Sequence, residues 1–96
     1  MDRHQIIEKL TPHRQMLRAL GVDSLRLFGS AARGESGPES DADFLVRFQG
    51  TPSFDRFMDL KQLLEDTLGV RVDLVTDDAL RPSMRATVER DAIRVA

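Results

Sequence analysis

The sequence predicts a small α/β (α+β) fold, with a mixed β-sheet and helices packed on one face of it. Its 96 residues leave room for one hydrophobic core, since domains commonly contain about 100–150 residues. Helix-like and strand-like segments alternate along the chain, as they do in a sheet covered by helices. Two expected strands are wholly apolar on one side only. We therefore expect residues 1–96 to form one domain.

Residues 2–20 are expected to be helical, because apolar residues recur there with a period near 3.6. Thr11 and Pro12 interrupt the pattern and leave two alternatives. Either two short helices form, with Thr11 as an N-cap, or one helix is kinked at Pro12. Gly21 would end the segment, and a strand over 24–28 would follow. The recurring apolar positions are Ile6, Ile7, Leu10, Leu17 and Leu20.

The second half of the chain predicts two more strands, two helices and a short edge strand. A strand over 42–48 precedes a helix that Ser53 would cap and Gly69 would stop. A third strand is expected over 70–75. Thr76 or Asp77 would cap a last helix over roughly 79–91, and Asp77 and Asp78 would serve its start, where negative charge is favourable. The tail, 92–96, would add the edge strand.

The two central strands place aspartates on one side and apolar residues on the other, because successive side chains alternate across a strand. Asp41 and Asp43 share a side in the second strand, and Asp73 lies opposite the apolar side of the third. If the two strands are neighbours, the three carboxylates lie together on the open side of the sheet. The residues expected to be buried are Ala42, Phe44, Val46, Val72 and Leu74.

Three clustered carboxylates repel one another unless a positive charge lies between them. Mg²⁺ prefers oxygen ligands and keeps positions open for substrate phosphates. Two such ions, about 3.5–4 Å apart, can stabilise the attacking and leaving oxygens of a displacement at phosphorus. Asp41, Asp43 and Asp73 are therefore candidate metal ligands. The alternative is structural: Asp41 caps a turn and Asp73 is a solvated strand residue.

Gly29 and Ser30 follow the first strand and open a short helical turn. A residue without a Cβ lets a phosphate approach the backbone, and the N–H groups there, with the Ser30 hydroxyl, would hold its oxygens. Arg33 lies about one turn further on and would meet the same anion. Alone, a Gly-Ser pair is usually just a turn.

Composition excludes several classes of function. The net charge of −2 and the scattered basic residues argue against nucleic-acid binding. The chain has no cysteine, which fits the cytoplasm and excludes disulfides and thiolate metal sites. No segment has the length or hydropathy of a signal peptide or a membrane span. His4 and His13 lie far in sequence from the aspartates, and we expect both on the surface.

The motifs together resemble a known family. The run GSAARG over 29–34 is followed after five residues by Ser40-Asp41-Ala42-Asp43 and a hydrophobic strand. This compound motif is similar to the signature of the polymerase-beta-type nucleotidyltransferase superfamily, and Asp73 matches its third carboxylate. The similarity is strongest to the minimal nucleotidyltransferases, the antitoxin-like partners of HEPN-domain toxins, and covers nearly the whole chain. Mild departures are Phe44, where Leu is commoner, and Asp91, where Glu is usual.

The resemblance implies a nucleotidyltransferase fold and Mg²⁺-dependent transfer of AMP from ATP. Gly29, Ser30 and Arg33 would hold the triphosphate. Asp41 and Asp43 would hold two Mg²⁺ ions, and Asp73 would complete one metal site and help to deprotonate or orient the attacking hydroxyl. The implied acceptor is a hydroxyl, commonly of tyrosine, on a HEPN-type ribonuclease toxin.

One constraint on the acceptor comes from the sequence itself. The chain contains no tyrosine, so tyrosine modification by it occurs in trans. Two other functions stay open: a binding subunit that neutralises its partner stoichiometrically, and the transferase subunit of an antibiotic-modifying enzyme. The second usually needs additional domains, for which we expect no room in these 96 residues. The acceptor residue, the nucleotide preference, the number of AMP units and the oligomeric state are not specified by the sequence.

Overall fold

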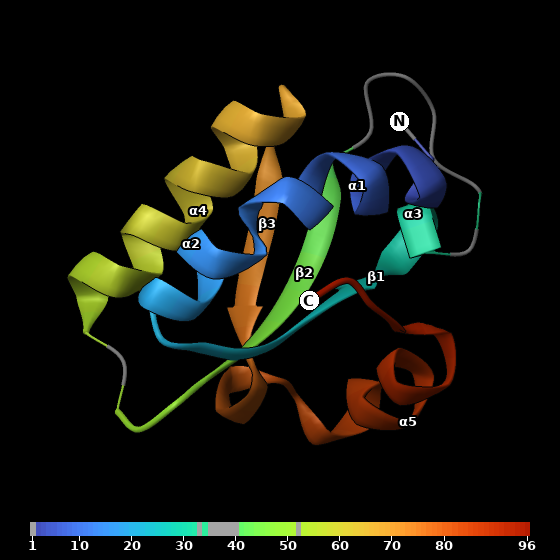
Figure 1. The fold of residues 1–96 in the computed structure, drawn as a ribbon. Coiled ribbons are helices and arrows are strands. Elements are labelled where there is room, and N and C mark those ends of the chain that lie inside the picture. The colour runs from blue at the N-terminus through green and yellow to red at the C-terminus, as the bar shows by residue number, and fades with distance from the viewer. Residues whose placement is uncertain (1, 33, 35–40, 52) are drawn as a thin grey trace.

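The computed structural model of this protein describes residues 2–32, 34, 41–51 and 53–96 (Figure 1). Its strands form one mixed sheet in the order β3-β2-β1-β4. Strands β2 and β3 are parallel, and β1 is antiparallel to both β2 and β4. The strands are β1 (Val22–Phe28), β2 (Ala42–Phe48), β3 (Val72–Thr76) and β4 (Ile93–Arg94).

The helices lie on both faces of this sheet. Helices α1 and α4, with α2, cover one face, and α5 lies across the other (Figure 1). The short α3 follows β1 directly. The helices are α1 (Arg3–Leu10), α2 (Arg14–Ala19), α3 (Gly29–Ala32), α4 (Phe54–Leu68) and α5 (Pro82–Asp91), with 3₁₀ turns at Thr11–His13 and Asp77–Ala79.

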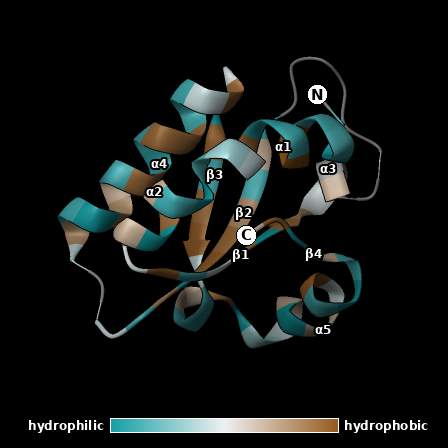
Figure 2. Ribbon diagram, viewed as in Figure 1, coloured by the Kyte–Doolittle hydropathy of each residue, from teal (hydrophilic) through white to brown (hydrophobic). Residues whose placement is uncertain are grey.

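The main hydrophobic core lies between the sheet and helices α1, α2 and α4. Hydrophobic residues dominate β2 and β3, whereas hydrophobic and hydrophilic residues alternate along the helices (Figure 2). The predicted burial is confirmed: the exposed fraction is 8% or less at Ala42, Phe44, Val46, Val72 and Leu74. Burying such side chains contributes about 1.5–3 kcal/mol each.

A smaller cluster packs α5 onto the second face of the sheet. Leu45 points away from the main core and is 1% exposed beneath Leu80 and Val88. Helices α1, α2 and α4 therefore pack on one face, as predicted, whereas the predicted last helix, α5, packs on the other face of the sheet. This face is half apolar because Leu45 and Val75 follow the aspartates at period two.

The N-terminal segment follows the alternative with two short helices. Asp2 caps α1 by accepting a hydrogen bond from the Gln5 amide at 2.9 Å, and the Gln5 side chain accepts from the Asp2 amide at 3.0 Å. Thr11 was expected to be the N-cap of the second helix, but it is not, because its hydroxyl donates back to the Ile7 carbonyl at 2.7 Å. Pro12 lies in the 3₁₀ turn that joins α1 to α2, where its missing N–H costs no helical hydrogen bond.

The predicted caps of α4 are confirmed. The Ser53 hydroxyl accepts from the Arg56 amide at 3.2 Å, and Gly69 ends the helix with a φ of +69°. Strand β1 begins two residues earlier than predicted and β3 two residues later. The predicted edge strand forms as β4. Among the described residues, no helix has the length and hydropathy that crossing a membrane requires.

The predicted start of the last helix is wrong. Thr76 and Asp77 make no side-chain cap, a 3₁₀ turn follows β3, and α5 begins at Pro82. Proline favours the first helical position because its φ is already helical and no N–H is lost. The Asp77 carboxylate pairs instead with two arginines, as described below.

Candidate active site

The predicted neighbours β2 and β3 place Asp43 and Asp73 side by side. The two residues are direct partners in the parallel register, one step along from Ala42 and Val72. Asp41 lies directly before the first residue of β2, two positions from Asp43. Asp41 and Asp73 are exposed and Asp43 is half-buried. The register therefore brings two of the three predicted carboxylates, those of Asp43 and Asp73, together on the second face of the sheet.

The carboxylates do not form a closed metal cage by themselves. Within residues 2–32, 34, 41–51 and 53–96, no three His, Asp or Glu side chains are grouped closely enough to hold a metal ion. Neither Asp41 nor Asp73 makes an ion pair with the described residues. Two exposed carboxylates that pair with no basic side chain in the described part of the chain offer oxygen donors to a ligand.

Gly29 lies against the Asp43 carboxylate because β1 ends where β2 begins. Phe28 is the register partner of Asp43, and Gly29 turns the chain into α3 with a φ of +74°. A Cβ at this position would collide with the Asp43 carboxylate. Glycine is thus required both by its backbone conformation and by the close approach.

The other two predicted nucleotide-binding residues are less fully described. The Ser30 backbone belongs to α3, next to Gly29, and its position fits a turn beside the carboxylates. Arg33 lies outside the described residues. The roles of Ser30 and Arg33 stay predictions.

A cleft of about 680 Å³ opens between the carboxylates and α5. Gly29, Asp43 and Asp73 form its acidic end, and α5 forms the opposite wall. Its size lies within the range of small-molecule sites, about 300–1,000 Å³. The α5 wall and the segment before it contribute Leu80, Arg81, Ser83, Met84, Thr87 and Val88.

These wall residues were not predicted as part of the site. Met84 is 45% exposed and lines the cleft instead of packing in the core. Asp91, noted above only as a departure from the family pattern, lines the cleft as well. The spacing of Met84 and Val88 is the signal that could have found the wall, since residues four apart share one side of a helix.

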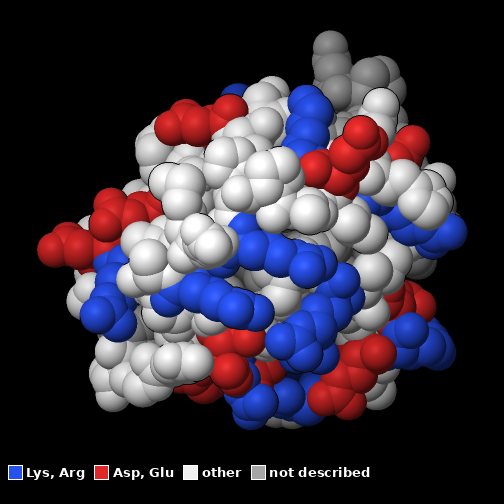
Figure 3. All heavy atoms as spheres, viewed as in Figure 1, with Lys and Arg blue, Asp and Glu red and all other residues white. Residues whose placement is uncertain are grey.

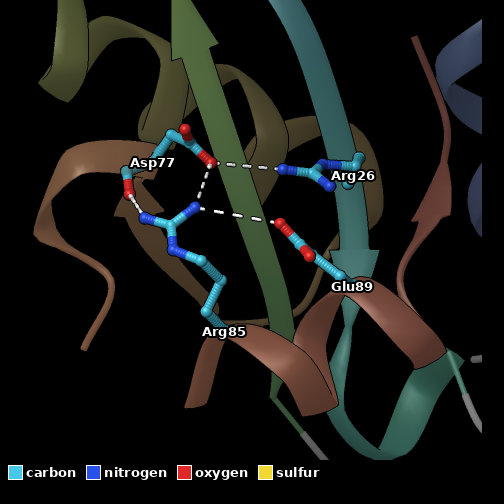
Figure 4. A network of polar contacts seen from close by, with 4 residues as sticks. All are labelled: Arg26, Asp77, Arg85 and Glu89. Atoms are coloured by element: carbon cyan, nitrogen blue, oxygen red, sulfur yellow. Dashed lines mark hydrogen bonds and ion pairs between the residues drawn. The ribbon is translucent and has the colours of Figure 1, made fainter. Parts of the chain in front are cut away.

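A network of charged residues holds α5 against the sheet (Figure 4). The Asp77 carboxylate lies 3.2 Å from the Arg26 guanidinium of β1 and 4.0 Å from that of Arg85 on α5. Arg85 also donates to the Asp77 carbonyl at 3.3 Å and lies 3.9 Å from Glu89. Asp77 thus links a strand to the wall of the cleft, instead of serving the start of the last helix.

Comparison with known proteins agrees with this arrangement. The nucleotidyltransferase domain family matches residues 10–95. The protein adenylyltransferase MntA of Thermococcus cleftensis is 42% identical over 87 residues, which cover 90% of this chain and 88% of that protein. A solved structure of a presumed minimal nucleotidyltransferase superposes with a TM-score of 0.84 at 38% identity, over 97% of this chain and 95% of that one.

A further solved structure shows the same fold within a complex. It contains a tri-AMPylated HEPN toxin of Shewanella oneidensis bound to an MNT antitoxin. The TM-score is 0.67, with 21% identity over 97% of this chain and 71% of that chain, so the likeness is one of fold alone.

The chain belongs to the nucleotidyltransferase domain family, as the motif over residues 29–43 indicated. Within that family it is similar, over nearly its whole length, to a minimal nucleotidyltransferase and to a protein adenylyltransferase.

Proposed function

We propose that this protein transfers AMP from ATP to a hydroxyl on a partner protein and acts as the antitoxin of a HEPN-type toxin. The observation that carries the proposal is the pairing of Asp43 with Asp73 beside Gly29, at one end of a cleft of about 680 Å³. Family membership supports the class of reaction.

In this proposal Gly29, Ser30 and Arg33 bind the triphosphate and Asp73 orients the acceptor. The hydroxyl oxygen bonds to the α-phosphorus, the bond from that phosphorus to the pyrophosphate oxygen breaks, and Asp73 takes the proton. The acidic end of the cleft would hold the reacting groups, and the apolar part of the α5 wall would face the base.

The carboxylates fit Mg²⁺ through the chemistry of their donors. In nucleotide sites this ion is commonly held by one or two carboxylates together with phosphates and water, so the absence of a three-ligand group in the described residues is no obstacle. We propose that Asp41 and Asp43 hold two ions and that Asp73 completes one of the sites. Bound Mg²⁺ would neutralise phosphate charge at the α-phosphorus.

The acceptor is expected in trans. The chain has no tyrosine, and the cleft offers one wall, α5, opposite the carboxylates. A partner protein can supply both the hydroxyl and the orientation on which much of the rate depends. The AMPylated HEPN toxin in the fold relative makes a HEPN-domain protein the first partner to test. We expect the reaction in the cytoplasm.

ATP labelled at the α-phosphorus tests the reaction. With Mg²⁺ and the HEPN-domain protein encoded in the same genome, the label should move to that protein, whereas a label at the γ-phosphorus should leave as pyrophosphate. Transfer of the γ-label would contradict nucleotidyl transfer and indicate phosphorylation. Formation of a tight complex without either label would favour stoichiometric neutralisation instead.

A further inference from the structure

Basic side chains gather on the surface beside α2 and the C-terminal end of the chain, in the middle of the face seen in Figure 3. Two grooves lie there, of about 320 and 470 Å³. Asp23 and Arg94 line both of them, so the grooves adjoin. The arginine surface, as we define it, consists of Arg14, Arg18, Arg47 and Arg94.

The strand register concentrates positive charge at this place. Arg26 and Arg94 are direct partners across β1 and β4, and Arg47 is paired with Ser24, two residues from Arg26. Like charges placed opposite each other destabilise a sheet unless something compensates them. Asp77 compensates Arg26 at 3.2 Å, but it does not pair with the other two arginines.

The four arginines of the surface are exposed and make no ion pair with the described residues. Arg94 donates to the Ala96 carbonyl at 3.0 Å, a contact that leaves its charge uncompensated. Asp23 is the acidic residue common to both grooves, and it is exposed without an ion pair there. The surface is therefore positive on a chain whose net charge is −2.

Helix α5 separates the larger groove, with Arg47 and Arg94, from the cleft. Met84 and Val88 line the cleft, whereas Arg85 and Glu89 line the larger groove. These pairs point to different sides because residues four apart share a face and adjacent ones do not. A helix with its side chains is about 10–12 Å across, so a protein bound in the larger groove lies about one helix diameter from the cleft.

The composition of the surface favours a protein over a nucleic acid. Asp23, Asp77 and Glu89 interrupt the basic residues and would repel a continuous phosphate backbone. No aromatic residue lines either groove in the described part of the chain, so bases would find nothing to stack on. Arginine is enriched at protein interfaces and binds carboxylates with its planar fork.

We propose that the arginine surface docks acidic side chains of the protein that receives AMP. The proposal rests on the proposed function, since it assigns that function a partner of stated chemistry. Surface charges of this kind steer association more than they hold the final complex. The surface would therefore set how readily the acceptor protein reaches the cleft, while ATP binding depends on the other side of α5.

Charge reversal tests the proposal, with the HEPN-domain protein of the same genome as the probe. In Arg14→Glu/Arg18→Glu and in Arg47→Glu/Arg94→Glu, the KM for that protein should rise about tenfold or more. The dissociation constant for ATP should change less than about twofold. Lys9→Glu/Lys61→Glu makes the same change in charge away from both grooves and should leave both constants unaltered. Thermal unfolding checks that each variant is folded.

Salt dependence adds a second readout. Between about 50 and 300 mM NaCl the KM of the wild type should rise, because exposed charges are screened, and the reversed variants should lose this dependence. An unchanged KM in both reversed variants would overturn the docking proposal, with transfer itself intact. The wild type could instead bind single-stranded RNA near physiological salt, and the charge reversals could abolish that binding. This result would overturn the docking proposal and indicate a nucleic-acid surface. If the wild type transfers no AMP at all, the proposed function fails first.

Discussion

Asp43 and Gly29 touch because the chain leaves β1 at the level where β2 begins. The contact ties a backbone conformation that favours glycine to a carboxylate that would bind metal. The same residue is thereby constrained twice, by its φ of +74° and by the space that Asp43 occupies. At the scale of single residues, this contact makes the site sensitive to one methyl group.

Gly29→Ala should cost about 1–3 kcal/mol of unfolding free energy through backbone strain and should displace Asp43. We expect transfer to fall about 100-fold or more, since small displacements of reacting groups have effects of that size. Gly69→Ala is the matched control: its φ is +69°, but nothing lies within 4 Å of the added Cβ. It should lose similar stability and keep its specific activity. Equal activity of the two variants would contradict the contact.

Asp43→Asn should keep the fold and lose the response to metal. For the wild type, saturating Mg²⁺ with ATP at about 100 times its Kd adds about 2.7 kcal/mol. This raises the Tm on the order of 10 °C for a chain of this size. The amide cannot replace an anionic ligand, so the variant should show a much smaller rise with an unchanged Tm in the absence of ligand. A wild type without any Mg²⁺-dependent rise would remove the metal assignment.

Helix α5 is the element that turns a row of carboxylates into a cleft. Val88 of α5 and Leu80, just before the helix, pack on Leu45, and Asp77 connects Arg85 of α5 to Arg26 of β1. The exposed Met84 is a large apolar side chain facing the cleft rather than the core. Methionine adapts its shape to a flat ring and contacts aromatic systems favourably, which suits it to the base of a nucleotide.

Met84→Ala should weaken ATP binding about three- to tenfold through lost apolar contact. It should leave the binding of inorganic tripolyphosphate unchanged, because that ligand has no base. Met58→Ala on α4 is the matched control, with a similar exposed fraction, 41% against 45%. Calorimetric titration of the wild type and the two variants, with ATP and with tripolyphosphate, measures these affinities. Equal loss for ATP and tripolyphosphate would mean that Met84 only supports the fold of α5.

The comparison of these elements with the sequence shows which kinds of interaction can be predicted. The strand faces depend on local periodicity and the caps of α4 on the residue types of Ser53 and Gly69, and both were predicted. The meeting of Asp43 with Asp73 depended in addition on the pairing of β2 with β3, which was a condition of that prediction. The side of the sheet on which α5 packs is not encoded locally, since an apolar stripe fits either face. The Asp77–Arg26 pair joins residues 51 positions apart, and no spacing rule connects them.

At the scale of the whole molecule, the larger groove of the arginine surface and the cleft lie on either side of α5. The chain has a cleft of about 680 Å³ beside its aspartates, but it lacks a tyrosine to modify. Both features are explained if the protein acts in a complex with another protein that supplies the acceptor. The central claim is therefore that the protein completes its active site with the acceptor protein.

Intact-mass spectrometry of the HEPN-domain partner, incubated with this protein, ATP and Mg²⁺, tests that claim most directly. We predict mass increments of whole adenylates on the partner, together with loss of its ribonuclease activity. Neither change should occur with Asp41→Ala/Asp43→Ala, although that variant should remain folded and bound to the partner. A partner that is neutralised by the double variant without ever gaining an adenylate would contradict the account.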